Sequence, residues 1–163
     1  MQIGVDQSSI IKASSQFWEQ MLAMKLDPMA TLDGFCLGAG HVLGTVILSG
    51  AWSGSIEIRM DEGLTLQATA AMLMQSPESV QEADTLDAAK EISNMIAGGI
   101  KSSLPRPCAM TVPEAAVAGC RYCGAMRAQH SVAVAFRHDA GEMIVSVLMD
   151  RTNDETAPAA RCA

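Results

Sequence analysis

Hydrophobic and polar positions follow a helical period most clearly between residues 83 and 105. Apolar side chains recur there every three or four residues, a spacing that predicts a helix with one face against a core. They are Leu86, Ala89, Ile92, Ile96, Ile100 and Leu104. The opposite face carries polar or small residues at the same spacing, namely Asp87, Glu91, Asn94, Gly98 and Lys101. Prolines at positions 105 and 107 are expected to end this helix.

Shorter patterns before and after this segment predict two more helices and several strands. Helices are expected at 7–26, with Ser8 or Ser9 as the N-cap, and at 61–74. Strands are expected at 41–48, 55–60, 109–112, 114–118, 131–136 and 142–148, with turns at 50–54, 119–124 and 137–141.

The order of these elements is helix, strands, two helices, strands, so most strands are grouped rather than placed between helices. Such grouping is typical of an α+β fold, and we expect an antiparallel sheet with helices packed on one face. A chain of 163 residues is long enough for one domain with its own core. We expect that domain to span residues 1–150, followed by a polar C-terminal tail at 151–163.

The net charge and the hydropathy of the chain argue against two classes of partner. The formal net charge is −7 and the basic residues form no cluster, which argues against nucleic acid as a partner. No apolar run reaches the roughly 18 residues that a membrane span needs, so we expect no membrane partner. The N-terminal residues lack the basic and apolar blocks of a secretion signal, and a cytoplasmic location is the expectation.

The cysteines are five in number, at positions 36, 108, 120, 123 and 162. In the absence of an export signal, reduced thiols are expected rather than a disulfide framework. Cys120 and Cys123 have the spacing of half a zinc site, but a second close pair is missing. Zinc binding and redox chemistry remain alternatives, and we favour two thiols near a β-turn, with no metal bound by the chain.

The polar face of the 83–105 helix is the main candidate for chemistry. Glu91 and Asn94 are three residues apart, so their side chains are neighbours on a helix. A carboxamide donates and accepts hydrogen bonds together and can therefore orient a water molecule. A merely solvated helix face is the alternative reading of the same spacing. Gly98 and Gly99 each cost a helix about 1 kcal/mol relative to alanine, so we expect another backbone to come close there.

Familiar phosphatase motifs are missing from the chain. Cys120 and Arg127 are seven residues apart, one more than a cysteine phosphatase loop requires, and neither HExxH nor GxSxG occurs. An enzyme without its own nucleophile or metal would need its partner to supply them.

The pattern Asp87-x3-Glu91-x2-Asn94-Met95-Ile96-x-Gly98, followed by Lys101 and Leu104, resembles the active-site helix of the CheX chemotaxis phosphatases. These proteins belong to the CheC/CheX/FliY group, which acts on phosphorylated CheY. The order of elements along nearly the whole chain is also similar. The resemblance implies a phosphatase that hydrolyses the aspartyl phosphate of a CheY-type receiver domain and so terminates a chemotaxis signal. The receiver would bring its own Mg²⁺ and Lys, and this chain would need no cofactor of its own.

The same resemblance implies roles for the two catalytic candidates. Asn94 would position the attacking water, and Glu91 would contact the receiver's active-site Lys. Gly98 would let the receiver's loops approach, although a close helix–strand contact inside this chain explains that glycine equally well.

Asp87 and Lys101 are candidates for partner binding on the same helix face. Ordinary solvated helix charges are the simpler reading of both, and Asp87 is placed to pair with Lys90.

Counting asparagines distinguishes between subfamilies. CheC-like proteins resemble two halves with a Glu-x-x-Asn helix in each, but Asn94 and Asn153 are the only asparagines here. The first helix offers Glu19 with Leu22 three residues on, so a second such motif is ruled out. CheX-like proteins are homodimers, and a homodimer is expected by resemblance. Two alternatives remain: a non-catalytic CheX-like module that binds a receiver domain, and a structural homodimer without a receiver partner.

Overall fold

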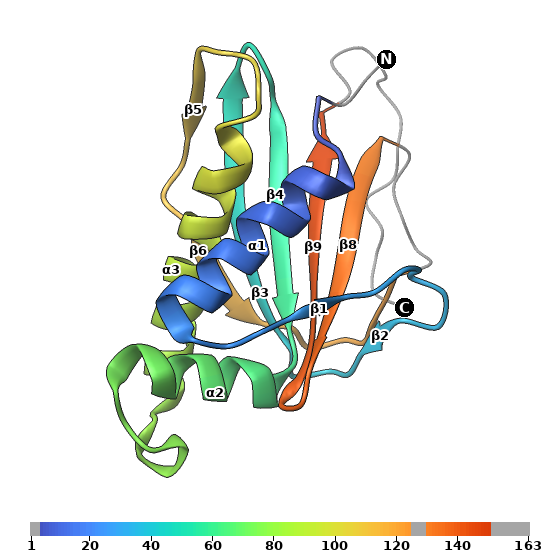
Figure 1. Ribbon diagram of the computed structural model, residues 1–163. Coiled ribbons are helices and arrows are strands. Elements are labelled where there is room, and N and C mark those ends of the chain that lie inside the picture. The colour runs from blue at the N-terminus through green and yellow to red at the C-terminus, as the bar shows by residue number, and fades with distance from the viewer. Residues whose placement is uncertain (1–3, 125–129, 151–163) are drawn as a thin grey trace.

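A computed structural model describes residues 4–124 and 130–150 (Figure 1). Its helices are α1 (Gln7–Leu22), α2 (Glu62–Leu73) and α3 (Glu82–Lys101), with a short 3-10 turn, η1 (Pro77–Ser79), before α3. The strands are β1 (Asp27–Pro28), β2 (Cys36–Leu37), β3 (Val42–Gly50), β4 (Gly54–Met60), β5 (Cys108–Met110), β6 (Glu114–Val117), β7 (Tyr122–Cys123), β8 (Ser131–His138) and β9 (Gly141–Met149).

A single antiparallel sheet organises the molecule. Its strands follow the order β1-β8-β9-β4-β3-β5, and β6 also pairs with β3. β3 and β4 form one hairpin with Val46 opposite Ile56, and β8 and β9 form the other with Val134 opposite Val145. β5 and β6 lie along different halves of β3, so together they make one interrupted edge strand. The expected hairpins and the expected edge strands are therefore confirmed.

The helices cover one face of this sheet, as the grouping of elements predicts (Figure 1). Between helices and sheet lies the main core, in which Trp18 of α1 and Phe136 of β8 are fully buried. The buried face of α3 contributes Ile92, Ile96 and Ile100, all without exposed surface. Burying a side chain of this size contributes roughly 1.5–3 kcal/mol, so this stripe fixes which way α3 faces.

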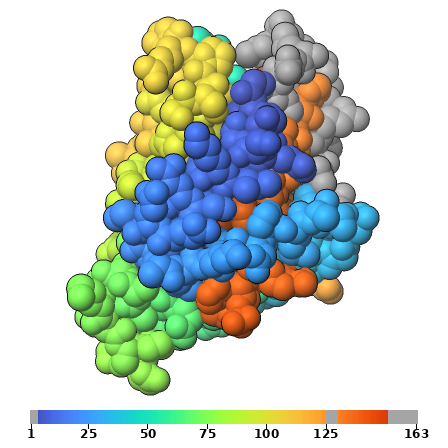
Figure 2. All heavy atoms as spheres, viewed as in Figure 1, coloured from blue at the N-terminus to red at the C-terminus, as the bar shows by residue number. Residues whose placement is uncertain are grey.

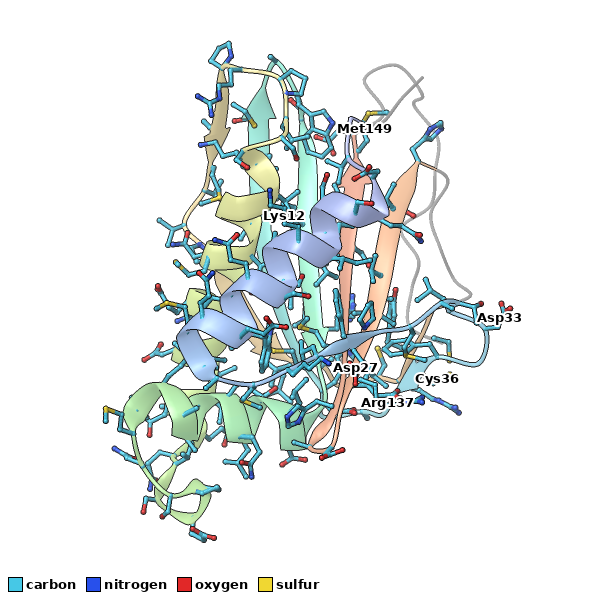
Figure 3. The ribbon with its side chains drawn as sticks, in the orientation of Figure 1. Lys12, Asp27, Asp33, Cys36, Arg137 and Met149 are labelled. Carbon is cyan, nitrogen blue, oxygen red and sulfur yellow. The ribbon has the colours of Figure 1, made fainter. Side chains whose placement is uncertain are left out.

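The other face of the sheet is partly covered by the chain between α1 and β3, where a small second sheet of β2 and β7 forms. After α1 the chain first crosses on the helix side of the sheet, where Asp27 and Pro28 pair with the edge strand β8 (Figures 2 and 3). Further along, Phe35 and Leu37 are buried in a second apolar cluster together with Ile144 of β9. Neither β2 nor its pairing with β7 is predicted by the sequence pattern, because two-residue strands show no alternation.

Several expected boundaries were wrong in detail. Asp6, not Ser8 or Ser9, caps α1, because its carboxylate accepts hydrogen bonds from the backbone N–H and the hydroxyl of Ser9, at 2.8 and 2.7 Å. α1 ends at Leu22 because Ala23 takes up a left-handed conformation, with φ of 52°. α3 ends at Lys101, and Leu104 beyond it is still buried. The expected C-terminal tail, 151–163, lies outside the described residues.

The cysteines also differ from expectation. Cys120 is disulfide-bonded, which contradicts the expectation of reduced thiols throughout the chain. Cys36, Cys108 and Cys123 carry free thiols. Cys123 lies in β7 rather than in a simple turn, directly opposite Cys36.

Candidate functional site

Charged residues stabilise both ends of α3. At its start the Asp84 carboxylate accepts a hydrogen bond from the backbone N–H of Gln81 at 2.9 Å, and Glu82 lies in the same first turn. At its end Lys101 occupies the last turn. Acidic groups near the N-terminus and a cation near the C-terminus both complement the helix dipole. The helix is therefore stabilised at its ends without using the polar residues in its middle.

Glu91 and Asn94 lie one turn apart on the side of α3 that faces away from the core. Glu91 is exposed and Asn94 is half-buried, between the fully buried Ile92 and Ser93 on one flank and the exposed Met95 on the other. Within residues 4–124 and 130–150, neither side chain makes a hydrogen bond or an ion pair. Both polar groups are thus positioned by the helix and available to a partner.

A second wall faces these two residues. It consists of Met110, the last residue of β5, and of residues 111–113, the turn between β5 and β6. With α3 this wall encloses a groove of about 490 Å³. The hydroxyl of Thr111 accepts a hydrogen bond from the backbone N–H of Ile47 at 3.1 Å, and Thr111 N–H donates to the Ile47 carbonyl at 2.9 Å. These bonds fix the turn to β3. Val112 at its tip is 84% exposed, a large apolar side chain beside a polar helix face.

An adjoining depression continues along the same face of α3 toward its C-terminus. It measures about 830 Å³ and is lined by Gly98, Lys101, Ser102, Arg106, Pro107, Cys108 and Met110. Met110 lines both depressions, and we call the two together the α3 trough. All five residues singled out on the polar face of this helix line it: Asp87, Glu91, Asn94, Gly98 and Lys101.

Charge is distributed unevenly along the trough. Its first part holds Asp87 and Glu91, with Lys90 paired to Asp87 at 3.3 Å, which leaves the Glu91 carboxylate as the unpaired charge there. Its second part holds Lys101 and Arg106, and none of the described residues that line it is acidic. A surface that docks here would be complementary if it presented a cation toward Glu91 and an anion toward the second part.

The two glycines of α3 serve different purposes. A Cβ atom on Gly99 would lie 2.9 Å from the Cβ of Ala13, so Gly99 is where α1 approaches α3 closely. A Cβ atom on Gly98 would meet no described atom within 4 Å. Among the described residues, the helix–strand contact considered for Gly98 is therefore not found, and Gly98 opens onto the trough. The close contact is instead one between helices, at Gly99.

Sequence reasoning missed the wall opposite α3. Residues 110–113 carry no catalytic residue type, and only their position after the edge strand β5 brings them to face Glu91 and Asn94. Arg106 was missed as well, because a single basic residue between two prolines has no distinctive pattern. The signal that could have found the wall is the exposed Thr111-Val112-Pro113 break between two expected edge strands.

The described residues contain no group of three or more His, Cys, Asp or Glu side chains that could hold a metal ion. None of the helices in that part of the chain is both long and apolar enough to cross a membrane.

A family model described as "Chemotaxis phosphatase CheX" matches residues 42–137, which is more than half of the chain. This protein belongs to the CheX family. The match runs from the start of β3 to the second-last residue of β8, and so includes α3 and both walls of the α3 trough. Among curated proteins, no match was found.

Solved structures of the CheX group share this fold. The chemotaxis protein CheX from Vibrio vulnificus is 22% identical, with a TM-score of 0.69 over 88% of this chain and 95% of that one. A CheC-like superfamily protein from Shewanella sp. PV-4 is 22% identical, with a TM-score of 0.69 over 88% and 96%. The CheX in a CheX-CheY-BeF3-Mg complex from Borrelia burgdorferi is 19% identical, with a TM-score of 0.64 over 88% and 97%. At these identities the likeness establishes the fold, and the expected CheX-like α+β architecture is confirmed.

Proposed function

We propose that this protein is a phosphatase that hydrolyses the aspartyl phosphate of a CheY-type receiver domain, with Asn94 positioning the attacking water. The observation that carries the proposal is the presence of Glu91 and Asn94, unpaired and one turn apart, in a trough open to a protein partner. The family to which the chain belongs supports it, as does the complex of a CheX with CheY from Borrelia burgdorferi.

The chemistry asks little of this chain beyond geometry. An acyl phosphate is already an activated electrophile, and its hydrolysis is accelerated mainly by a water held in line with the breaking bond. The Asn94 carboxamide can accept one hydrogen bond from that water and donate another toward the phosphoryl oxygens. It stands on a helix whose orientation is fixed by buried isoleucines, so the backbone of Asn94 is in position before the partner arrives.

Glu91 is assigned to docking rather than to proton transfer. Its carboxylate is exposed and unpaired, and the nearest cation on the helix, Lys90, is already engaged by Asp87. A receiver's active-site Lys would be attracted to Glu91 and would set the register in which Asn94 reaches the phosphate. Gly98 and Lys101, further along the trough, would then contact the receiver's neighbouring loops, with Asp87 supporting the helix face.

The partner is expected to contribute the metal. Mg²⁺ bound by the receiver neutralises charge on the phosphoryl group, and this chain needs to supply only the water and the docking surface. The proposed phosphatase is a homodimer in the cytoplasm, as the resemblance to CheX leads us to expect. Sedimentation of the purified protein tests the dimer.

Dephosphorylation of a CheY-type receiver, labelled with a small phosphodonor, tests the proposal. We expect the wild type to accelerate phosphate loss and Asn94→Ala to reduce that acceleration about 100-fold, since one positioned hydrogen-bonding group is typically worth this much. Gln16→Ala is the matched control, because Gln16 is an exposed carboxamide on α1, away from the trough. It should retain full activity.

Binding to the phosphorylated receiver separates the proposal from its alternative. Asn94→Ala should bind as tightly as the wild type while failing to accelerate hydrolysis. If the wild type binds the receiver without accelerating hydrolysis, the chain is a non-catalytic receiver-binding module. If the wild type neither binds any receiver from its own cell nor dephosphorylates it, both the phosphatase proposal and the receiver-binding alternative are wrong.

A further inference from the structure

Two free thiols lie next to each other in the small sheet of β2 and β7, away from α3. Cys36 of β2 and Cys123 of β7 are 87 positions apart in sequence, yet their Sγ atoms are 2.7 Å apart (Figure 3 labels Cys36). From this geometry we propose that Cys36 and Cys123 form a reversible disulfide, a covalent modification site that cross-links the two strands of the small sheet. The proposal does not depend on the proposed phosphatase activity.

The backbone favours this bond. Cys36 lies opposite Cys123, and the N–H of Gly124 donates to the carbonyl of Phe35 at 2.9 Å. This hydrogen bond joins the residues next to the two cysteines, so Cys36 and Cys123 are a non-hydrogen-bonded pair. Such a non-hydrogen-bonded antiparallel pair brings its Cα atoms to about 4.5 Å and its side chains closer together. That separation is within the range that a disulfide spans.

The small sheet is anchored even without the bond. Phe35 and Leu37, the neighbours of Cys36, are buried against the main sheet. On the other strand, the guanidinium of Arg59 lies 4.5 Å from the centre of the Tyr122 ring, next to Cys123. Arg59 is itself held by hydrogen bonds to the Nε2 atom of His41 and the carboxylate of Glu57, at 3.0 and 3.1 Å. The two thiols are therefore held face to face before any oxidant arrives.

The reaction is an ordinary thiol–disulfide exchange with a low-molecular-weight disulfide as the oxidant. The contact with Cys36, and then burial, raise the pKa of the Cys123 thiol. The exchange is written with Cys36 attacking first. The Cys36 thiolate attacks one sulfur of the small disulfide, forms a mixed disulfide and releases one small thiol. Cys123 then loses its proton and attacks the Cys36 sulfur, releasing the second small thiol. The two cysteines lose two electrons and two protons, and the small disulfide gains them.

Tryptic peptide mapping without reductant tests the connectivity. Reduced protein is treated with oxidised glutathione, remaining thiols are alkylated, and the digest is analysed by mass spectrometry. Trypsin cuts after Lys25, Arg59, Lys101, Arg121 and Arg127, so Cys36 and Cys123 fall in the separate peptides 26–59 and 122–127. Cys120, which is disulfide-bonded, falls in the third peptide, 102–121. We expect 26–59 joined to 122–127.

Two results of the mapping would overturn the proposal. One is peptide 122–127 joined to 102–121, which would pair Cys123 with another cysteine. The other is alkylation of both Cys36 and Cys123 after an oxidation that has restored the bond of Cys120.

Thermal unfolding supplies a second readout. A bond between positions 36 and 123 closes a long loop, so oxidation should raise the Tm of the wild type by roughly 10 °C. Cys36→Ser and Cys123→Ser should both lose most of that increase, whereas Cys108→Ser, a free and half-buried thiol elsewhere in the fold, should keep it. An unchanged increase in Cys36→Ser would contradict the proposal, because the stabilisation would then come from the bond of Cys120 alone.

Discussion

α1 and α3 lie against each other on the same face of the same sheet (Figure 1). The candidate site lies on α3. Each helix has an exposed glutamate, Glu19 on α1 and Glu91 on α3. Three residues after Glu19 comes Leu22, which is buried, while three residues after Glu91 comes the half-buried Asn94. The same spacing therefore produces a core contact in one helix and an accessible pair of polar groups in the other.

The second difference lies outside the helices. α3 faces the turn between β5 and β6, so the polar side of α3 forms one wall of the trough and the turn forms part of the other. Glu19 lines none of the grooves described here. The comparison teaches that an exposed glutamate on a helix is ordinary, and that the partner residue one turn later and the opposite wall distinguish Glu91.

The largest difference between the two helices should come from reversing the charge of each glutamate in turn. Glu91→Lys should weaken binding of a phosphorylated receiver about 100-fold, because a lysine there would face the receiver's own cation, and like charges in contact cost several kcal/mol. Glu19→Lys changes the net charge equally but leaves the trough intact, and its affinity should stay within about twofold of the wild type. Titration of labelled receiver measures both. Equal losses in the two variants would show that overall charge, not the site, governs docking.

Filling the trough should have the next largest effect. Gly98→Leu places a side chain in the open space beside Lys101, and we expect about a tenfold loss of receiver dephosphorylation as docking is obstructed. Gly98→Ala removes a helical glycine with a much smaller intrusion and should lose little activity. Rates measured over a range of receiver concentrations should place the loss in KM. Full activity of Gly98→Leu would mean that the receiver does not approach this part of α3.

Stability should separate the two adjacent glycines. Gly98→Ala should raise the free energy of unfolding by up to about 1 kcal/mol, since alanine is the better helix former and the new methyl group meets open space. Gly99→Ala should lower it by about 1 kcal/mol, because a methyl group there forces α1 away at Ala13. Urea unfolding measures both values. Stabilisation of both variants would show that α1 and α3 can separate at no cost.

The smallest expected effect concerns the start of α1. Hydrogen bonds from the hydroxyl and then the backbone N–H of Ser9 hold the pKa of Asp6 below its ordinary value. The stabilisation from this cap is therefore complete above the ordinary pKa of an aspartate and is lost as the pH falls through the lowered value. Asp6→Ala should lower Tm by about 3 °C at neutral pH, and the difference from wild type should vanish in acid. A difference independent of pH would exclude the charged cap as its cause.

The sequence was sufficient for much of the fold because the patterns involved are local. The stripe of Ile92, Ile96 and Ile100 predicts which face of α3 is buried, and the alternation of Ile56 and Ile58 in β4 predicts which face of the sheet receives it. Both depend only on the period of one element. The trough needs a long-range contact between α3 and residues 110–113, which no local pattern contains.

The glycine pair illustrates a different limit. Gly98 and Gly99 are indistinguishable in sequence, since both are helical and both carry the same propensity cost. Because successive residues point in different directions around a helix, Gly99 meets α1 while Gly98 faces open space. The meeting of Cys36 with Cys123 was missed for the related reason that two-residue strands have no readable period. The roles of Glu91 and Asn94 in catalysis stay predictions until the variants are measured.

The interrupted edge strand bears on the order in which the protein folds. The β3–β4 and β8–β9 hairpins close over short turns, but β5 reaches β3 by pairing Met110 with Leu48, across all of α2 and α3. Closing so long a loop is entropically costly, so this contact raises the contact order and should form after the hairpins. Within the part of the chain that the structure describes, β5 and β6 also pair with β3 alone. The wall of the trough should consequently exchange its amide hydrogens sooner than the hairpins, since it can open without unfolding the rest.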